Sequence, residues 1–347
     1  MMMLRKDSIV ALCCVLLGGC TRSTRSTVVL RDSGTVQRAN STSHAPAQKP
    51  ETMSLLGRPL YAHPIGPDLT KLKDDLAAAE ADQAAHPEDP AKIVWVGRRL
   101  GYLWRMNDAI DVFTKGIRKF PQYAPLYRHR GHRYISIRQF DQAIADLEKA
   151  AQLIRGQPDE IEADGMPNER GIPLTTTGFN VWYHLGVARY LKGEYEGALR
   201  SFQATMKYTR NLGDNVVAVS DWMYLTLRRL GRHDEAAAIL GPIQPHMDII
   251  ENRAYHQRLL MYKGQIEPVE VLDVKSASGL EFATLGYGVG YWYLHAGQTE
   301  TAMKVFRQVV ESLYWPAFGY IAAEVELARE RDRTEKLSFR ARKNPRY

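Results

Sequence analysis

Two histidines three residues apart, His129 and His132, form the arrangement in this chain that comes closest to a metal site. On a helix that spacing places both imidazoles on one face, an arrangement that metal sites use. No carboxylate lies at a helical interval from either histidine, and Arg130 between them adds an unfavourable positive charge. The sequence therefore predicts no metal site here.

Other patterns typical of catalysis are incomplete or absent. The run Gly-Tyr-Gly-Val-Gly at 286–290 superficially resembles a phosphate-binding loop, but it lacks a preceding strand and a Lys-Ser/Thr ending. We expect these glycines to lie inside a helix and to permit close packing. No serine stands in a nucleophile-elbow pattern, and all three cysteines (Cys13, Cys14 and Cys20) fall within the first twenty residues. We predict that the protein is not an enzyme and has no cofactor.

The amino terminus has the features of a secretory signal. Arg5 and Lys6 precede an apolar run, 9–17, that is too short to span a bilayer. The run leads into Leu-Gly-Gly-Cys at 17–20, which resembles the lipobox of bacterial lipoproteins. This resemblance implies cleavage before Cys20 and acylation of its thiol and new amino group, which together give stable membrane attachment. We predict a signal peptide at 1–19 and a lipid anchor at Cys20; the alternative is an ordinary signal peptide with a chance cysteine.

The residue after the cysteine bears on location. In Gram-negative lipoproteins an Asp there favours retention at the inner membrane, whereas this chain has Thr21. The resemblance therefore implies the bacterial cell envelope, and the outer membrane if the source is Gram-negative. From Thr21 to about Glu51 the chain lacks periodic apolar residues and cannot bury enough surface to offset its ordering entropy. We predict that 20–65 comprises the lipidated cysteine and a flexible linker.

Composition describes the rest of the chain as globular. The sequence is 45% hydrophobic and 24% charged, so most of it should fold. The net charge of +7 permits attraction to acidic surfaces, but acidic and basic residues are mixed and no basic stripe occurs. Nucleic acid is therefore not a predicted partner, and no feature specifies an oligomeric state.

An internal period of 34 residues is the strongest structural signal. Ala109 and Ala143 are 34 residues apart, and Gly97 with Gly131 and Phe113 with Leu147 coincide at the same offset. The clearest copy contains Trp182, Leu185, Gly186, Tyr190, Gly193, Tyr195, Ala198 and Phe202, and the last contains Val289, Gly290, Tyr293, Gly297, Ala302 and Phe306. This pattern resembles the tetratricopeptide (TPR) repeat, a 34-residue helix-turn-helix, although Arg189 stands where that family has an aromatic residue. The resemblance predicts an all-α solenoid of TPR-type helical hairpins.

Each residue type in the pattern has a packing role. Small residues allow the two helices of a hairpin to approach closely, and large ones fill the space between successive hairpins. Because one hairpin alone exposes an apolar face, several must stack. The small residues are Gly97, Gly131, Gly186 and Gly290 on first helices and Ala109, Ala143, Ala198, Ala236 and Ala302 on second helices; the large ones are Phe113, Leu147, Phe202 and Phe306; Gly193, Gly231, Gly264 and Gly297 mark turns.

These units give a map of the chain. We place the solenoid at 66–330, with hairpins near 90–123, 124–154, 179–212, 217–246, 250–275 (degenerate) and 283–316. A capping helix is expected at 69–85, a closing helix at 317–329, and a basic, frayed tail at 331–347. The hairpins at 124–154 and 179–212 are separated by an insertion, 155–178, with an acidic cluster at 159–164. The insertion is either a functional loop or a segment hanging in solvent.

The TPR resemblance implies that the first helix of each hairpin lines a concave face. Nine side chains, mainly basic, polar and aromatic, are expected there. Arg and Trp are frequent interface anchors, and Arg forks suit carboxylates or phosphates. These candidate partner-binding residues, called the predicted groove set below, are Arg98, Arg128, His129, His132, Tyr183, His184, Asp221, Trp222 and Arg228.

Two functions remain open at this stage. The first is a membrane-anchored scaffold whose groove binds an acidic or extended segment of another envelope protein or peptide. The alternative is a lipoprotein receptor for a small ligand or an anionic envelope glycan, which predicts a closed pocket lidded by the insertion. The groove set also permits an interpretation as solvated and inter-helix contacts without a ligand. The carboxylate clamp of chaperone-binding TPRs is not predicted, because Arg128, His132 and His184 replace its Lys and Asn residues.

Overall fold

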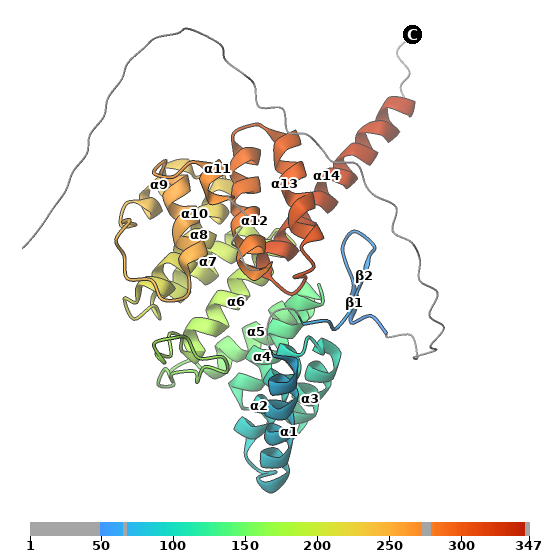
Figure 1. Cartoon of the computed structure of the whole chain (residues 1–347), viewed down its shortest axis with the longest axis vertical. Coiled ribbons are helices and arrows are strands. Elements are labelled where there is room, and N and C mark those ends of the chain that lie inside the picture. Colours follow the sequence, from blue (N-terminus) through green and yellow to red (C-terminus); the bar gives the residue numbers. More distant parts are fainter. Residues whose placement is uncertain (1–48, 65–67, 273–278, 344–347) are drawn as a thin grey trace, which may run out of the picture. The chain divides into compact units, whose positions relative to one another are not determined.

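The computed structural model describes residues 49–64, 68–272 and 279–343, which form fourteen α-helices and one pair of short strands (Figure 1). The predicted signal peptide at 1–19, the lipidation site Cys20 and the linker up to residue 48 lie outside the described residues. Within the described part, no helix combines the length and apolar character needed to cross a bilayer.

The helices follow one another as hairpins. After α1 (Leu69–Ala85) come α2 (Pro90–Tyr102) with α3 (Met106–Lys119), α4 (Ala124–Ser136) with α5 (Phe140–Leu153), α6 (Thr177–Lys192) with α7 (Tyr195–Met206), and α8 (Gly213–Arg229) with α9 (His233–Leu240). Next come α10 (Arg253–Tyr262), the single turn α11 (Pro268–Val271), the hairpin of α12 (Gly279–His295) with α13 (Thr299–Glu311), and α14 (Phe318–Lys343). The predicted all-α array of helical hairpins is confirmed.

Glycine sets the spacing inside the hairpins. A Cβ placed on Gly186 of α6 would lie 2.6 Å from Cδ1 and 2.7 Å from Cζ of Phe202, and one on Gly290 of α12 would lie 2.7 Å from Cδ1 of Phe306. Both phenylalanines are fully buried. These distances are shorter than van der Waals contact, so a side chain at either glycine would force the helices apart. The run 286–290 accordingly lies inside α12 and acts in packing.

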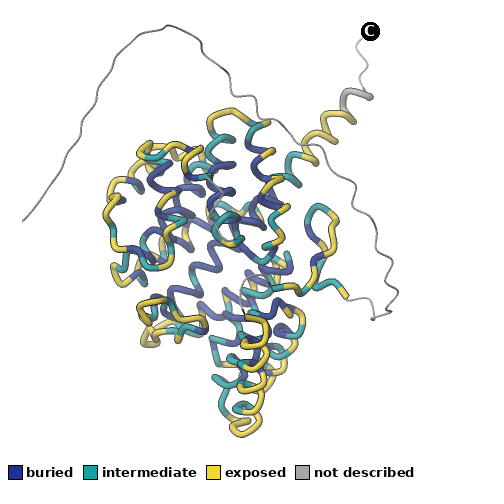
Figure 2. Tube along the Cα trace, viewed as in Figure 1, coloured by how far each residue is buried: buried dark blue, intermediate teal, exposed yellow. Residues whose placement is uncertain are grey.

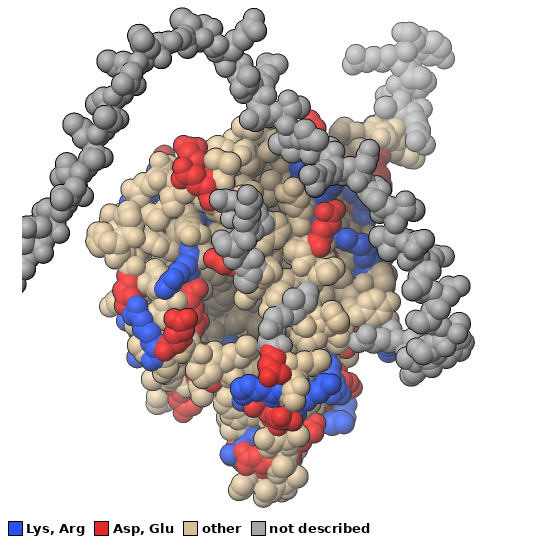
Figure 3. Space-filling view, viewed as in Figure 1, with Lys and Arg blue, Asp and Glu red and all other residues tan. Residues whose placement is uncertain are grey.

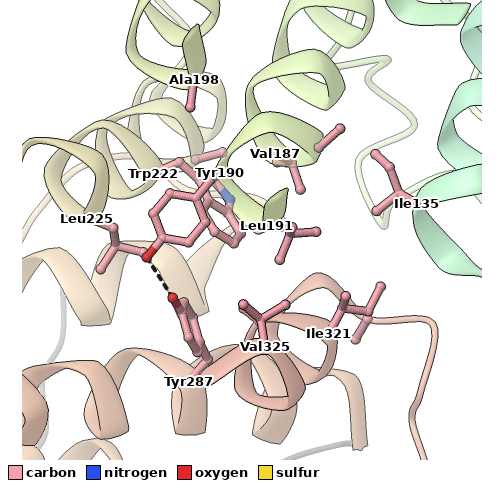
Figure 4. Close-up of a cluster of buried hydrophobic side chains, with 14 of the residues drawn as sticks. Ile135, Val187, Tyr190, Leu191, Ala198, Trp222, Leu225, Tyr287, Ile321 and Val325 are labelled. Atoms are coloured by element: carbon pink, nitrogen blue, oxygen red, sulfur yellow. Dashed lines mark hydrogen bonds between the residues drawn. The ribbon is translucent and has the colours of Figure 1, made fainter. Parts of the chain in front are cut away.

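The first helices of the later hairpins converge on α14. Tyr190 of α6 and Tyr287 of α12 are hydrogen-bonded through their hydroxyls at 2.7 Å (Figure 4). Trp222 of α8 packs beside both, with ring centroids 5.1 Å from Tyr190 and 6.1 Å from Tyr287. Val325 of α14 closes the same cluster. The surface that an open solenoid would expose is therefore core here, and α6 and α8 are largely buried (Figure 2).

Residues 49–64 contradict the predicted flexible linker over that range. Strand β1 (Thr52–Met53) pairs antiparallel with β2 (Pro59–Leu60), and Leu60 is buried in the main core. The indole N–H of Trp315 donates to the Tyr61 carbonyl at 2.9 Å. The linker prediction was wrong here because the segment gains its contacts from residues far along the chain, whereas two-residue strands leave no alternating pattern in the sequence.

The carboxyl-terminal helix also differs from its prediction. Helix α14 continues to Lys343, so the predicted frayed tail at 331–347 is wrong for 331–343. The first half of α14 is buried and 331–339 is exposed (Figure 2). The physical reason is local: good helix formers continue through this stretch, and no Gly or Pro interrupts them before Pro345.

Candidate functional site

The insertion at 155–178 packs along the first helices of the hairpins, so the interpretation as a loop hanging in solvent is wrong. Arg98 and Arg99 of α2 donate to the carbonyls of Ala163 (2.8 Å) and Gly165 (3.0 Å). Further along, Arg170 forms a bidentate pair with Asp248, at 2.8 and 2.9 Å, in the segment before α10. The insertion therefore runs from the first hairpin to the fourth.

Seven side chains beneath the insertion form what we call the basic cluster. They come from three neighbouring first helices, α2, α4 and α6, and alternate between guanidinium and imidazole groups. Arg128 donates to Nδ1 of His129 at 2.9 Å, and Arg133 donates to Nδ1 of His132 at 2.8 Å. The His132 and His184 rings lie 4.4 Å apart. The cluster consists of Arg98, Arg99, Arg128, Arg133, His129, His132 and His184.

Two carboxylates only partly balance these four guanidinium groups. Glu162 of the insertion lies 2.9 Å from Arg128, and Asp75 of α1 lies 3.1 Å from Arg99. Among the described residues, Arg133 pairs with no carboxylate, and burial beside Arg128 lowers its pKa to about 10. The Nε of Arg128 is buried without a hydrogen-bond partner. Four cations against two anions leave an excess of two positive charges, so the cluster favours an anion.

The three imidazoles are neutral at pH 7. Burial, reinforced by the neighbouring arginines, holds the pKa values of His129, His132 and His184 well below 6.5. Nδ1 of His184 lies 2.6 Å from the carbonyl of Asn180, which fixes its ring. Within residues 49–64, 68–272 and 279–343, no group of three or more His, Cys, Asp or Glu side chains is arranged to hold a metal ion.

A cavity of about 720 Å³ lies beside the basic cluster. Three aromatic side chains from different elements line it: Tyr183 of α6, Tyr255 of α10 and Phe318 of α14. Phe318 joins cavity and cluster, because its ring lies 5.3 Å from His132 and 5.6 Å from His184. The remaining lining is mostly polar and comes from the insertion, the start of α10 and α12: Asn168, Glu169, Arg170, Ile250, Glu251, Asn252, Arg253, Ala254, Leu280, Glu281 and Thr284. Figure 3 shows a hollow on one face, bordered by acidic and basic side chains.

The structure brings part of the predicted groove set together. Five of its nine members, Arg98, Arg128, His129, His132 and His184, belong to the basic cluster, and Tyr183 lines the cavity. Arg228 lies apart from them, donating to the hydroxyl of Tyr224 at 3.1 Å.

Two members of the set cannot reach a partner, which corrects the prediction for Asp221 and Trp222. Both are 0% exposed. The Trp222 indole donates to the Tyr183 hydroxyl at 2.9 Å, and Asp221 pairs with buried Arg258 at 2.8 Å. Burial raises the pKa of Asp221 to about 7, although Arg258 opposes that rise. The reason is that α10 and α12 pack against this side of α8, so a helix face expected to be open became core.

Sequence reasoning missed five site residues: Arg99, Arg133, Glu162, Tyr255 and Phe318. One signal was present, because Arg98–Arg99 and His132–Arg133 are separated by the same 34-residue period. The acidic cluster of the insertion was visible, but the contact of Glu162 with Arg128 depends on tertiary structure. Tyr255 and Phe318 lie in a degenerate repeat and in the closing helix, where no repeat register could place them.

Comparison with known proteins identifies one repeat. Residues 285–313, which cover most of α12 and α13, match the tetratricopeptide repeat family model, so this hairpin is a TPR unit and the repeat predicted there is confirmed. No curated protein matches the chain in sequence.

Several solved structures resemble the chain at low identity. They include YrrB, described as a TPR protein with an unusual peptide-binding site (15% identity, 68% of this chain and 93% of that chain, TM-score 0.39). A tetratricopeptide repeat protein from Parabacteroides merdae has 14% identity over 75% of this chain and 93% of its own, with TM-score 0.46. The apo form of the quorum sensor NprR from B. thuringiensis has 14% identity over 70% and 84%, with TM-score 0.34. Likenesses of this degree carry no argument about function.

Proposed function

We propose that this protein is a membrane-anchored TPR scaffold of the bacterial cell envelope whose cavity binds an extended segment of a protein partner. The observation that carries the proposal is the 720 Å³ cavity, with its three aromatic side chains and its polar lining from several elements. Aromatic rings contribute large contact areas, while charged groups around them set orientation. No catalytic arrangement is part of the proposal.

Charge around the cavity supports a peptide as ligand. Acidic and basic side chains of both the insertion and the start of α10 line it, including Glu169, Arg170, Glu251 and Arg253. A peptide offers alternating carbonyls, amides and side chains that such a mixed lining can satisfy. The hydroxyls of Tyr183 and Tyr255 lie 3.3 Å apart, so the aromatic lining also offers hydrogen-bonding groups.

The anchor is the part of the proposal that rests on sequence. The segment 17–20 matches the lipobox pattern, and cleavage there would leave Cys20 at the new amino terminus. Two or more acyl chains would hold the protein at the membrane, and the residues after the cysteine would separate the helical array from it.

One observation favours the small-ligand receptor as a second candidate. The insertion forms part of the cavity lining, and the Asn168 side-chain amide, hydrogen-bonded to Glu251 at 2.7 Å, ties it to the residues before α10. A segment held in this way would enclose a small ligand or glycan fragment.

Site-specific cross-linking in cells tests the proposal. A photoreactive residue at Arg253, in the cavity lining, is expected to capture a discrete protein band. The matched control is Glu300 of α13, whose side chain is 84% exposed and which does not line the cavity. Identical bands from both positions, or none from Arg253, would argue against a protein partner here. A small molecule released from the purified protein by denaturation, and found by mass spectrometry, would instead support the receptor.

A further inference from the structure

The acidic part of the insertion lies on the basic cluster in an extended conformation. Backbone pairing holds it: the Glu162 amide donates to the Thr175 carbonyl at 3.0 Å, and the Thr177 amide donates to the Glu160 carbonyl at 2.9 Å. Ile161 and Thr176 form an isolated antiparallel bridge. The segment therefore has the backbone form of a bound peptide strand.

The cluster recognises this segment by two kinds of group. Arg128 binds the carboxylate of Glu162 at 2.9 Å, and Asn180 donates to the same carboxylate at 3.0 Å. Arg98 and Arg99 donate to successive backbone carbonyls, as described above. A site that grips a carboxylate and neighbouring main-chain oxygens together fits a peptide better than a free small anion.

Apolar burial contributes little to holding the segment in place. Ile161 and Met166 are 54% and 52% exposed. By contrast, the Arg128 side chain is only 8% exposed, and Glu162 partly covers it. The guanidinium of Arg133 still has no carboxylate partner among the described residues. The cluster therefore has unused capacity for negative charge.

We propose that the basic cluster is a binding site for an acidic, extended segment of a partner protein, and that residues 160–165 of the insertion occupy this site as an internal competitor. The inference deepens the proposed function, and it rests on that function only in assuming a protein partner. A partner segment displaces 160–165, places one carboxylate on Arg128 and brings a second to Arg133.

The test uses the full chain and a labelled nine-residue peptide with the sequence of 158–166, Pro-Asp-Glu-Ile-Glu-Ala-Asp-Gly-Met. Its binding is measured by fluorescence anisotropy at low salt. Glu162→Gln removes the charge that holds the internal segment, so it should bind the peptide about tenfold more tightly than the wild-type chain, as expected for loss of one charged hydrogen bond. The matched control is Glu160→Gln, which removes an exposed carboxylate that makes no printed contact with the cluster, and it should leave binding unchanged.

Two further measurements make the test decisive. Adding Arg128→Gln to the Glu162→Gln chain should abolish binding, with thermal melts showing that each variant is folded. Equal affinity of the wild-type and Glu162→Gln chains, or binding that survives loss of Arg128, would overturn the proposal. Displacement of the peptide by inorganic phosphate at matched concentration would overturn it in favour of a small-anion site. Cross-linking at Arg253 reports on the cavity and not on the cluster, so the two proposals can fail separately.

Discussion

Substitution of Gly186 by alanine tests the packing that builds each hairpin. The new Cβ would lie 2.6 Å from Cδ1 and 2.7 Å from Cζ of Phe202, a ring that is fully buried and cannot swing into solvent. Overpacking of this kind costs about 1–3 kcal/mol. Alanine regains about 1 kcal/mol of helix propensity relative to glycine. The clash should prevail, so we expect a net loss of about 1–2 kcal/mol in the free energy of unfolding.

The control lies in the same hairpin. A Cβ on Gly197 of α7 would lie 3.1 Å from Cδ of Arg189, the middle of a flexible side chain that can move aside. Gly197→Ala should therefore be neutral or stabilising by up to about 1 kcal/mol. Urea unfolding followed by circular dichroism at 222 nm measures both variants. Adding Phe202→Leu to Gly186→Ala should relieve the clash and give a favourable coupling of about 1 kcal/mol. A Gly186→Ala chain as stable as wild type would refute the reasoning.

Three further outcomes are expected. Because burial lowers the pKa values of the cluster histidines below 6.5, the unfolded chain binds more protons in acid; each histidine should then destabilise the fold by about 1.4 kcal/mol between pH 7.5 and 5.5, and urea titrations of His184→Gln should show a smaller loss than wild type. Arg138 and Glu324 pair at 2.9 Å with side-chain exposures of 3% and 0%, so Arg138→Met should cost about 3–5 kcal/mol, and Arg138→Met with Glu324→Leu should recover part of it; equal unfolding midpoints for the two variants would contradict this. Cys20→Ser should abolish incorporation of labelled palmitate and move the protein from the membrane fraction to the soluble fraction, whereas unchanged membrane recovery would disprove the anchor.

Local features of the fold were predictable because they depend on neighbours within one hairpin. Gly186 and Phe202 are sixteen residues apart, and their contact follows from the pairing of two consecutive helices. The glycine at 193 has φ +95° and caps α6, as a turn glycine should. Half of the basic cluster was accessible in the same way, because Arg98 and His132 occupy equivalent positions of adjacent repeats.

The amino-acid sequence alone determined the class of fold, the hairpin spacing and a basic inner face on the first two hairpins, since these follow from a period of 34 residues. Tertiary structure decided which part of that face stayed accessible. The small rotation between successive hairpins accumulates along the array, and no local pattern encodes the sum. As a result α10, α12 and α14 bury Asp221 and Trp222, while the insertion brings Glu162 onto Arg128. The most informative contact of the site thus joins two segments that the repeat pattern treats as unrelated.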